Sequence, residues 1–221
     1  IGSFGDTVTL DVAQWKQVAA RYKDKPANLY FELLNEPHDK LDDATWNAYL
    51  VDALAVVRAT NPSRPVVIGP AWWNSKDHIA QLKLPDADRN IIVTIHYYEP
   101  FKFTHQGASW AGKESAAWLG TTWKGTDEEK AAVKKHLAQV AKWGADNNRP
   151  IYLGEFGAYE KGALDSRERW TSFVAREAEA NHFTWSYWEY CSGFGVFDPK
   201  AKEYRQELLR ALVPDSALVK K

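Results

Sequence analysis

The chain has 221 residues, and its 28 Lys and Arg nearly balance its 29 Asp and Glu, which gives a formal net charge of −1. This balance argues against a nucleic-acid binder that neutralises phosphates and against attachment to an anionic membrane, because both need a basic excess. The length and the 45% hydrophobic content suit one sizeable domain, and no apolar run approaches the roughly 20 residues that span a bilayer.

Helical and strand periodicity alternate along the chain. In the first half the patterns predict a helix over about 11–23, a strand over 28–34, a helix over 43–59, a strand over 65–69 and a short helix around 75–82. In the second half they predict a strand over 91–98, a loop over 99–124, a helix over 127–147, a strand over 150–155, a helix over 167–180, a strand over 182–190 and a helix over 204–213.

Two local signals support these boundaries. Thr126 and Glu129 have the spacing of a capping box before the predicted helix at 127. Asn35-Glu36-Pro37 ends the first predicted strand at a polar tip. Five strands, each followed by a helical or partly helical segment and without a linker between two halves, predict one α/β domain with a parallel sheet.

Polar and aromatic residues gather where the predicted strands end. In parallel α/β folds the ligand site lies at the carboxyl ends of the strands. A single glutamate beside a turn is most often solvated or a cap, but here several chemical types converge and predict an active site. The candidates are Asn35, Glu36, Trp72, Trp73, His96, Tyr98, Glu155 and Trp188.

Two carboxylates with aromatic neighbours fit one reaction class better than the others. The sequence has no His-x-x-x-His or Cys-x-x-Cys spacing, no Gly-rich phosphate loop and no Gly-x-Ser-x-Gly elbow. We therefore expect neither a metal nor a cofactor. Glycoside hydrolysis needs two carboxyl groups around one bond, and the 11 tryptophans suit the apolar faces of sugar rings, although tryptophan also fills protein cores.

At this point the motifs resemble those of glycoside hydrolase family five, and in particular its bacterial endo-β-1,4-glucanases, the cellulases. The resemblance covers about residues 11–214. It rests on an ordered set at strand ends, namely Leu33-Leu34-Asn35-Glu36-Pro37, His96-Tyr97-Tyr98, Leu153-Gly154-Glu155-Phe156-Gly157 and Trp188, with the loop from Tyr98 to Trp110 between them. It implies a TIM (β/α)8 barrel that hydrolyses a neutral β-1,4-glucan.

The resemblance also implies roles for individual residues. Glu36 would be the general acid/base and Glu155 the nucleophile of a retaining double displacement, with carboxyl groups about 5–5.5 Å apart. Asn35 would bond the sugar's 2-hydroxyl, Tyr98 would hold Glu155 in place and ionised, and His96 would line the same subsite. Trp188 would be the stacking floor, and Trp72, Trp73 and Trp110 are softer candidates for neighbouring subsites. His38, His105 and Cys191 receive no role.

The chain departs from the family at its start. Only about 27 residues precede Asn28, and they hold one predicted helix, so the resemblance maps residues 1–221 onto one catalytic domain that lacks the first three βα units. The Arg and His that those units supply are absent, which predicts weaker catalysis. Strands four to eight form an incomplete barrel with two open edges, and we expect a homodimer to cover them.

Several alternatives remain open on the sequence. The chain could be a non-catalytic or weakly active glucan-binding remnant, or within the enzyme class a β-mannanase or mixed-linkage β-glucanase, because these share the core residues. A polymeric substrate predicts a secreted protein, while the first residues show no signal peptide.

Overall fold

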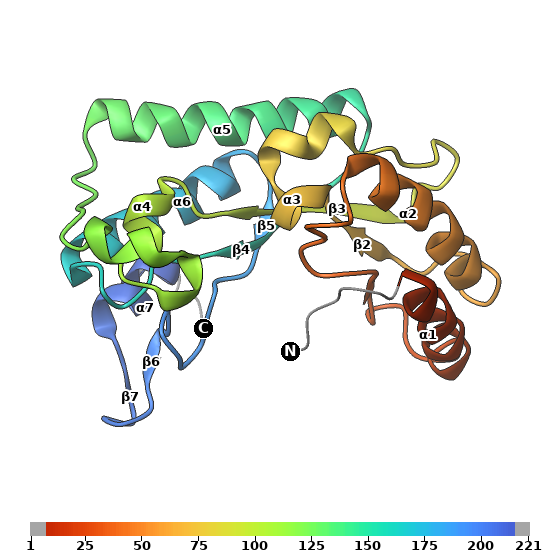
Figure 1. Ribbon diagram of the computed structural model, residues 1–221, viewed down its shortest axis with the longest axis horizontal. Helices are drawn as coiled ribbons and strands as arrows, with labels where there is room; N and C mark the ends of the chain where they lie inside the picture. The colour runs from red at the N-terminus through yellow and green to blue at the C-terminus, as the bar shows by residue number, and fades with distance from the viewer. Residues whose placement is uncertain (1–7, 215–221) are drawn as a thin grey trace. The chain divides into compact units, whose positions relative to one another are not determined.

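The computed structural model describes residues 8–214 and divides them into two compact units (Figure 1). Unit 1 holds the described residues up to Ile95 together with Trp143–Ile151, and unit 2 holds His96–Lys142 together with the described residues from Tyr152 on. Within residues 8–214, no helix has both the length and the apolar character needed to cross a membrane.

Five strands form one sheet in the order in which they occur along the chain, which confirms the predicted α/β class. They are β1 (Phe31–Glu32), β2 (Val66–Ile68), β3 (Ile91–Tyr97), β4 (Ile151–Phe156) and β5 (Thr184–Trp185). The pairs β1–β2, β2–β3 and β4–β5 are parallel. Parallel strands need crossover connections, and the helices between these strands supply them.

Two predicted strands were too long. The predictions covered 28–34 and 182–190, whereas β1 and β5 have two residues each. Both are the terminal strands of the sheet order, where a strand has only one neighbour to pair with. Beside β1, Leu29 and Tyr30 are exposed although their apolar character placed them in the buried strand.

Unit 1 contains α1 (Val8–Arg21), α2 (Asp43–Arg58), α3 (Ala71–Asn74) and the 3-10 helix η1 (Lys76–Gln81). The prediction for α2 is confirmed, and Asp42 caps it by accepting from Thr45 N at 2.8 Å. Helix α1 begins three residues before the predicted start at 11. α1 packs against α2.

Unit 2 contains most of α5 (Asp127–Asp146), together with α6 (Leu164–Ala180) and α7 (Gln206–Leu212), and α6 packs against α7. The Thr126–Glu129 capping box is confirmed, because each residue's side chain accepts from the other's main-chain N–H, at 3.3 and 2.9 Å. The predicted loop 99–124 includes three short helices, α4 (Phe101–Thr104), η2 (Ser109–Ala111) and η3 (Lys113–Trp118). The antiparallel hairpin of β6 (Phe197–Asp198) and β7 (Glu203–Tyr204) was not predicted.

The tryptophans fall into distinct classes of burial. Trp46, Trp123 and Trp170 are at most 1% exposed and belong to the cores of their units, which is the ordinary use of this side chain. Four others are more than a third exposed, namely Trp72, Trp73, Trp110 and Trp188. The tryptophan excess is therefore only partly a core feature.

Candidate active site

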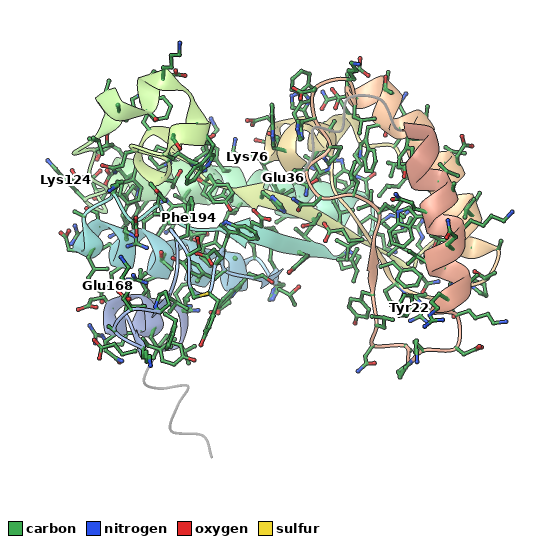
Figure 2. All side chains as sticks on the ribbon, turned by 60° about the horizontal axis from the view of Figure 1, so that its bottom comes forward. Tyr22, Glu36, Lys76, Lys124, Glu168 and Phe194 are labelled. Carbon is green, nitrogen blue, oxygen red and sulfur yellow. The ribbon has the colours of Figure 1, made fainter. Side chains whose placement is uncertain are left out.

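Glu36 lies in unit 1, four residues beyond the end of β1, on the segment that leads to α2 (Figure 2). It is half-buried, while Asn35 before it is exposed. The φ angle of Glu36 is 51°, in the left-handed region that residues other than glycine rarely occupy. Such a conformation costs about 1–3 kcal/mol and persists where surrounding contacts hold it, so it marks a position fixed by its neighbours.

Those neighbours include the turn that follows β2. Trp72, Trp73 and Asn74 have φ angles of 58°, 61° and 54°, a left-handed run within α3. The N–H of Trp73 donates to the main-chain oxygen of Pro37 at 3.2 Å. The two indole rings lie 6.2 Å apart and are 37% and 46% exposed. Unit 1 thus places an open aromatic surface next to the segment that carries Glu36.

In unit 2, the ends of β3 and β4 bring three predicted site residues together. The hydroxyl of Tyr98 donates to Oε2 of Glu155 at 2.8 Å, and Nδ1 of His96 lies 3.4 Å from the same oxygen. The side chains of His96 and Glu155 are only 3% and 14% exposed. Water therefore screens this group poorly, and its hydrogen bonds are stronger than they would be in solvent. The expected bond from Tyr98 to Glu155 is present.

The loop after β3 holds Tyr98 in place. The main-chain oxygen of Tyr98 accepts a hydrogen bond from Oγ1 of Thr104 at 2.6 Å. Its ring packs edge-on against His105, with centroids 4.9 Å apart, and against Phe194, with centroids 6.1 Å apart. His105 in turn stacks on Phe101 at 4.1 Å. These packing partners fix the direction of the hydroxyl toward Glu155.

Trp188 lies beyond β5 and is 46% exposed. The main-chain N–H of Trp188 donates to the main-chain oxygen of Phe156, the residue after Glu155, at 2.9 Å. A Cβ at Gly157 would lie 2.1 Å from the main-chain oxygen of Trp188, so only glycine allows the two segments to approach this closely. These contacts hold the backbone of Trp188 beside the end of β4, while the indole ring of Trp188 stays exposed to solvent.

The loop that follows Trp188 is organised by Glu189. Its carboxylate accepts from the main-chain N–H groups of Cys191, Ser192 and Phe194, with the shortest contacts at 3.0, 2.7 and 3.1 Å. Glu189 therefore orders the turn that presents Phe194 to Tyr98. Its carboxylate is engaged in this structural task.

The main-chain oxygen of Phe194 is a second anchor of that loop. It accepts from the hydroxyl of Tyr187 at 2.8 Å and from the buried guanidinium of Arg167 at 3.2 Å. Burial is the main cause that raises the pKa of Tyr187, and burial likewise lowers the pKa of Arg167. The phenol therefore stays protonated and donates over the ordinary pH range.

Trp110 lies on the loop after β3, and its ring is 6.3 Å from that of Phe194, centroid to centroid. It is 61% exposed, and its ring meets Tyr159 edge-on with centroids 4.9 Å apart. Tyr159 lies 5.5 Å from Phe194 by the same measure. A chain of ring contacts thus joins Trp110 to the packing around Tyr98.

Sequence reasoning missed the residues that position these groups. His38, His105 and Phe194 were given no part, yet His38 bonds the main-chain oxygen of Glu36, and the other two pack on Tyr98. Their partners lie two to 96 residues away along the chain, and only the short His38–Glu36 spacing offered a local signal. Of the predicted catalytic pair, Glu36 belongs to unit 1 and Glu155 to unit 2.

The chain is similar to several known endoglucanases. It is 33% identical to Endoglucanase H of Acetivibrio thermocellus over 204 residues, which cover 90% of this chain and 21% of that protein. A solved endoglucanase superposes with a TM-score of 0.91 and 40% identity, over 94% of this chain and 66% of the other. The endoglucanase of the hyperthermophilic Thermotoga maritima gives a TM-score of 0.89 and 47% identity, over 92% and 65% of the two chains. Structures of that enzyme have been solved with mannotriose and with cellobiose.

Compared with these relatives the chain is short. It spans about a fifth of the curated relative and about two thirds of the two solved chains. The model of the family described as cellulase (glycosyl hydrolase family 5) matches residues 5–193, which is most of the chain. The chain belongs to this family, and its five-stranded parallel sheet with helices is part of the family's TIM barrel.

Proposed function

We propose that the chain is a retaining endo-glycosidase that hydrolyses β-1,4-glucan, with Glu36 as acid/base and Glu155 as nucleophile. The observation that carries this proposal is the poorly hydrated group at the ends of β3 and β4, where Tyr98 donates to Glu155 beside His96. Family membership supports the assignment.

The chemistry follows from this arrangement. Tyr98 donates a hydrogen bond to Oε2 of Glu155, which fixes the orientation of the carboxylate that would attack the anomeric carbon. Glu36 would give a proton to the leaving oxygen, and the covalent glycosyl-enzyme would then be hydrolysed by water that Glu36 deprotonates. Glu155 is the penultimate residue of β4 and Glu36 follows β1, and the carboxyl ends of strands are where α/β barrels place their catalytic residues.

Exposed aromatic rings supply the sugar-binding part of the proposal. Trp188 would form the floor beneath the sugar that is cleaved, and Trp72, Trp73 and Trp110 would hold neighbouring sugars by stacking on their apolar faces. Asn35, exposed next to Glu36, would bond the 2-hydroxyl of the cleaved sugar.

We further propose that this chain supplies the fourth to eighth βα units of the barrel as a single catalytic domain. In the described sheet β1 and β5 are the terminal strands, and pairing with a second copy would satisfy their open edges. The expected state is a homodimer that acts outside the cell, because its substrate is a polymer. Light scattering that gave a monomer at micromolar concentration would refute the dimer.

Mannan is the second candidate substrate, because the Thermotoga maritima relative has been solved with mannotriose as well as cellobiose. The deciding experiment measures reducing sugar released from carboxymethylcellulose and from mannan by the wild type, Glu155→Gln and Glu36→Gln. Release by the wild type alone supports the hydrolase, and the preferred polymer decides the substrate. Equal background from all three proteins would leave a non-catalytic glucan-binding remnant.

Stereochemistry and geometry give two further tests of the proposal. Proton NMR of the first product should show the β-anomer, because double displacement retains configuration. A crystal structure should place the carboxyl groups of Glu36 and Glu155 about 5–5.5 Å apart, whereas about 8 Å in an ordered site would indicate inversion.

A further inference from the structure

His38 links the backbone of Glu36 to the aromatic surface of unit 1. Its Nδ1 lies 2.5 Å from the main-chain oxygen of Glu36. A carbonyl oxygen only accepts hydrogen bonds, so Nδ1 must carry a proton and donate. The other ring nitrogen, Nε2, lies 3.7 Å from the exposed carboxylate of Asp39. The tautomer of His38 is therefore set by the Glu36 carbonyl.

The same imidazole stacks on Trp73. The ring centroids are 4.9 Å apart and the planes are 11° apart, close to parallel. Together with the bond from Trp73 N–H to the oxygen of Pro37, this stack ties the Glu36 segment to the turn after β2 by two independent contacts. His38 is thus held on one side by a ring and on the other by the backbone that it bonds.

The backbone at this point needs such support. Glu36 has a φ of 51° and Asp39 a φ of 56°, so the two left-handed residues bracket His38. Left-handed residues other than glycine keep their conformation only where contacts hold them. A rotation of the Glu36 backbone would swing its carboxyl group, and the bond from His38 opposes that rotation.

We propose that His38 is a positioning residue for Glu36. It fixes the backbone from which the acid/base carboxyl group projects, and through its stack it couples that backbone to Trp73, a proposed sugar platform. This inference rests on the proposed function, because it concerns the same carboxyl group. Figure 2 shows Glu36, and His38 lies two residues farther along the same segment between β1 and α2.

Two substitutions separate the bond from the stack. His38→Phe keeps a flat ring on Trp73 and removes the donor, whereas His38→Asn keeps an N–H donor near the position of Nδ1 and removes the ring. The matched control is His78→Phe. His78 contacts Trp72, with centroids 5.6 Å apart, and pairs with Asp43 at 2.9 Å.

The assay compares aryl β-cellobiosides with poor and good leaving groups. His38→Phe should lower kcat for the poor leaving group about 10–100-fold, because a misplaced acid protonates it inefficiently. The loss should be smaller for a dinitrophenyl leaving group, which departs with little protonation. His38→Asn should recover most of kcat, and His78→Phe should match the wild type. KM should change much less than kcat in His38→Phe.

Wild-type kcat and leaving-group dependence in a folded His38→Phe would overturn the inference. A second measurement uses the wild type alone and so does not depend on whether a variant folds. Nitrogen-15 NMR of the imidazole should show a protonated Nδ1 coupled to the Glu36 carbonyl, and a proton on Nε2 alone would also overturn it. Failure of the proposed function is distinguishable, because then the wild type would be no more active than Glu36→Gln while the NMR signature of the bond persisted.

Discussion

Tyr98→Phe tests the hydrogen bond on which the proposed nucleophile depends. The substitution deletes one hydroxyl that donates to Glu155 Oε2 at 2.8 Å and keeps the ring that packs on His105 and Phe194. A bond to a charged group contributes about 1.5–3 kcal/mol. If all of it acted in the transition state, the rate would fall about 10–150-fold, at about 1.4 kcal/mol for each factor of ten.

The expected loss lies near the lower end of that range. Nδ1 of His96 stays 3.4 Å from the same oxygen, and removing a donor also makes the remaining carboxylate a stronger nucleophile. We expect kcat on an aryl β-cellobioside to fall about tenfold, with a free energy of unfolding lowered by at most about 1 kcal/mol. The measurement is steady-state kinetics combined with urea unfolding of the same preparations.

Tyr152→Phe is the matched control. Tyr152 lies on β4 three positions before Glu155, so their side chains face opposite sides of the strand. Its hydroxyl bonds Oγ of Ser186. The control should keep wild-type kcat. A Tyr98→Phe enzyme that was as active as the control would show that the bond to Glu155 has no part in catalysis.

Three further predictions concern stability and binding. Arg64→Leu should lower the free energy of unfolding by about 3–5 kcal/mol in urea titrations. The reason is that the Arg64 guanidinium donates to five main-chain oxygens between residues 22 and 29. As a control, Arg89→Leu at an exposed position should lower it by less than about 0.5 kcal/mol. The pKa of Tyr187 is raised in the folded state, so its contribution to stability is complete below the unfolded pKa of about 10 and is lost as the pH rises through the folded pKa. Between pH 9 and pH 11, the free energy of unfolding in urea should therefore fall less in Tyr187→Phe than in the wild type. Trp110→Ala should raise KM for a long glucan about three- to tenfold while kcat on a short aryl glycoside stays unchanged, and equal KM values would exclude Trp110 as a sugar platform.

The sequence predicted the sheet well because its signals are local. A short apolar run that ends in polar residues identified all five strands, and the spacing of Thr126 and Glu129 identified the start of α5. It predicted strand length poorly at β1 and β5, because length there depends on which neighbours pair with the strand. Arg64 illustrates the difference, since its donors hold the segment before β1 from 35 or more residues away.

The candidate site was predicted from residue types, and its support was not. Glutamate, tyrosine and histidine at strand ends are visible in one sequence, and unit 2 brings Glu155, Tyr98 and His96 together. The residues that hold them act through rings and backbone atoms from other segments. Phe194 reaches Tyr98 across 96 positions, so its packing role follows from the fold and not from a motif.

Burial and position along the chain divide the tryptophans into buried core residues and exposed residues that follow strand ends, a difference that composition alone does not show. Trp46 and Trp170 are buried on helices α2 and α6, and Trp123 is buried just before α5. The four exposed tryptophans all follow the carboxyl end of a strand, Trp72 and Trp73 after β2, Trp110 after β3 and Trp188 after β5. An exposed indole leaves a large apolar area in water, and burial against a ligand recovers that free energy. The proposed sugar-binding role of these four rings would recover part of that free energy, because each ring follows a strand end, where α/β folds bind their ligands.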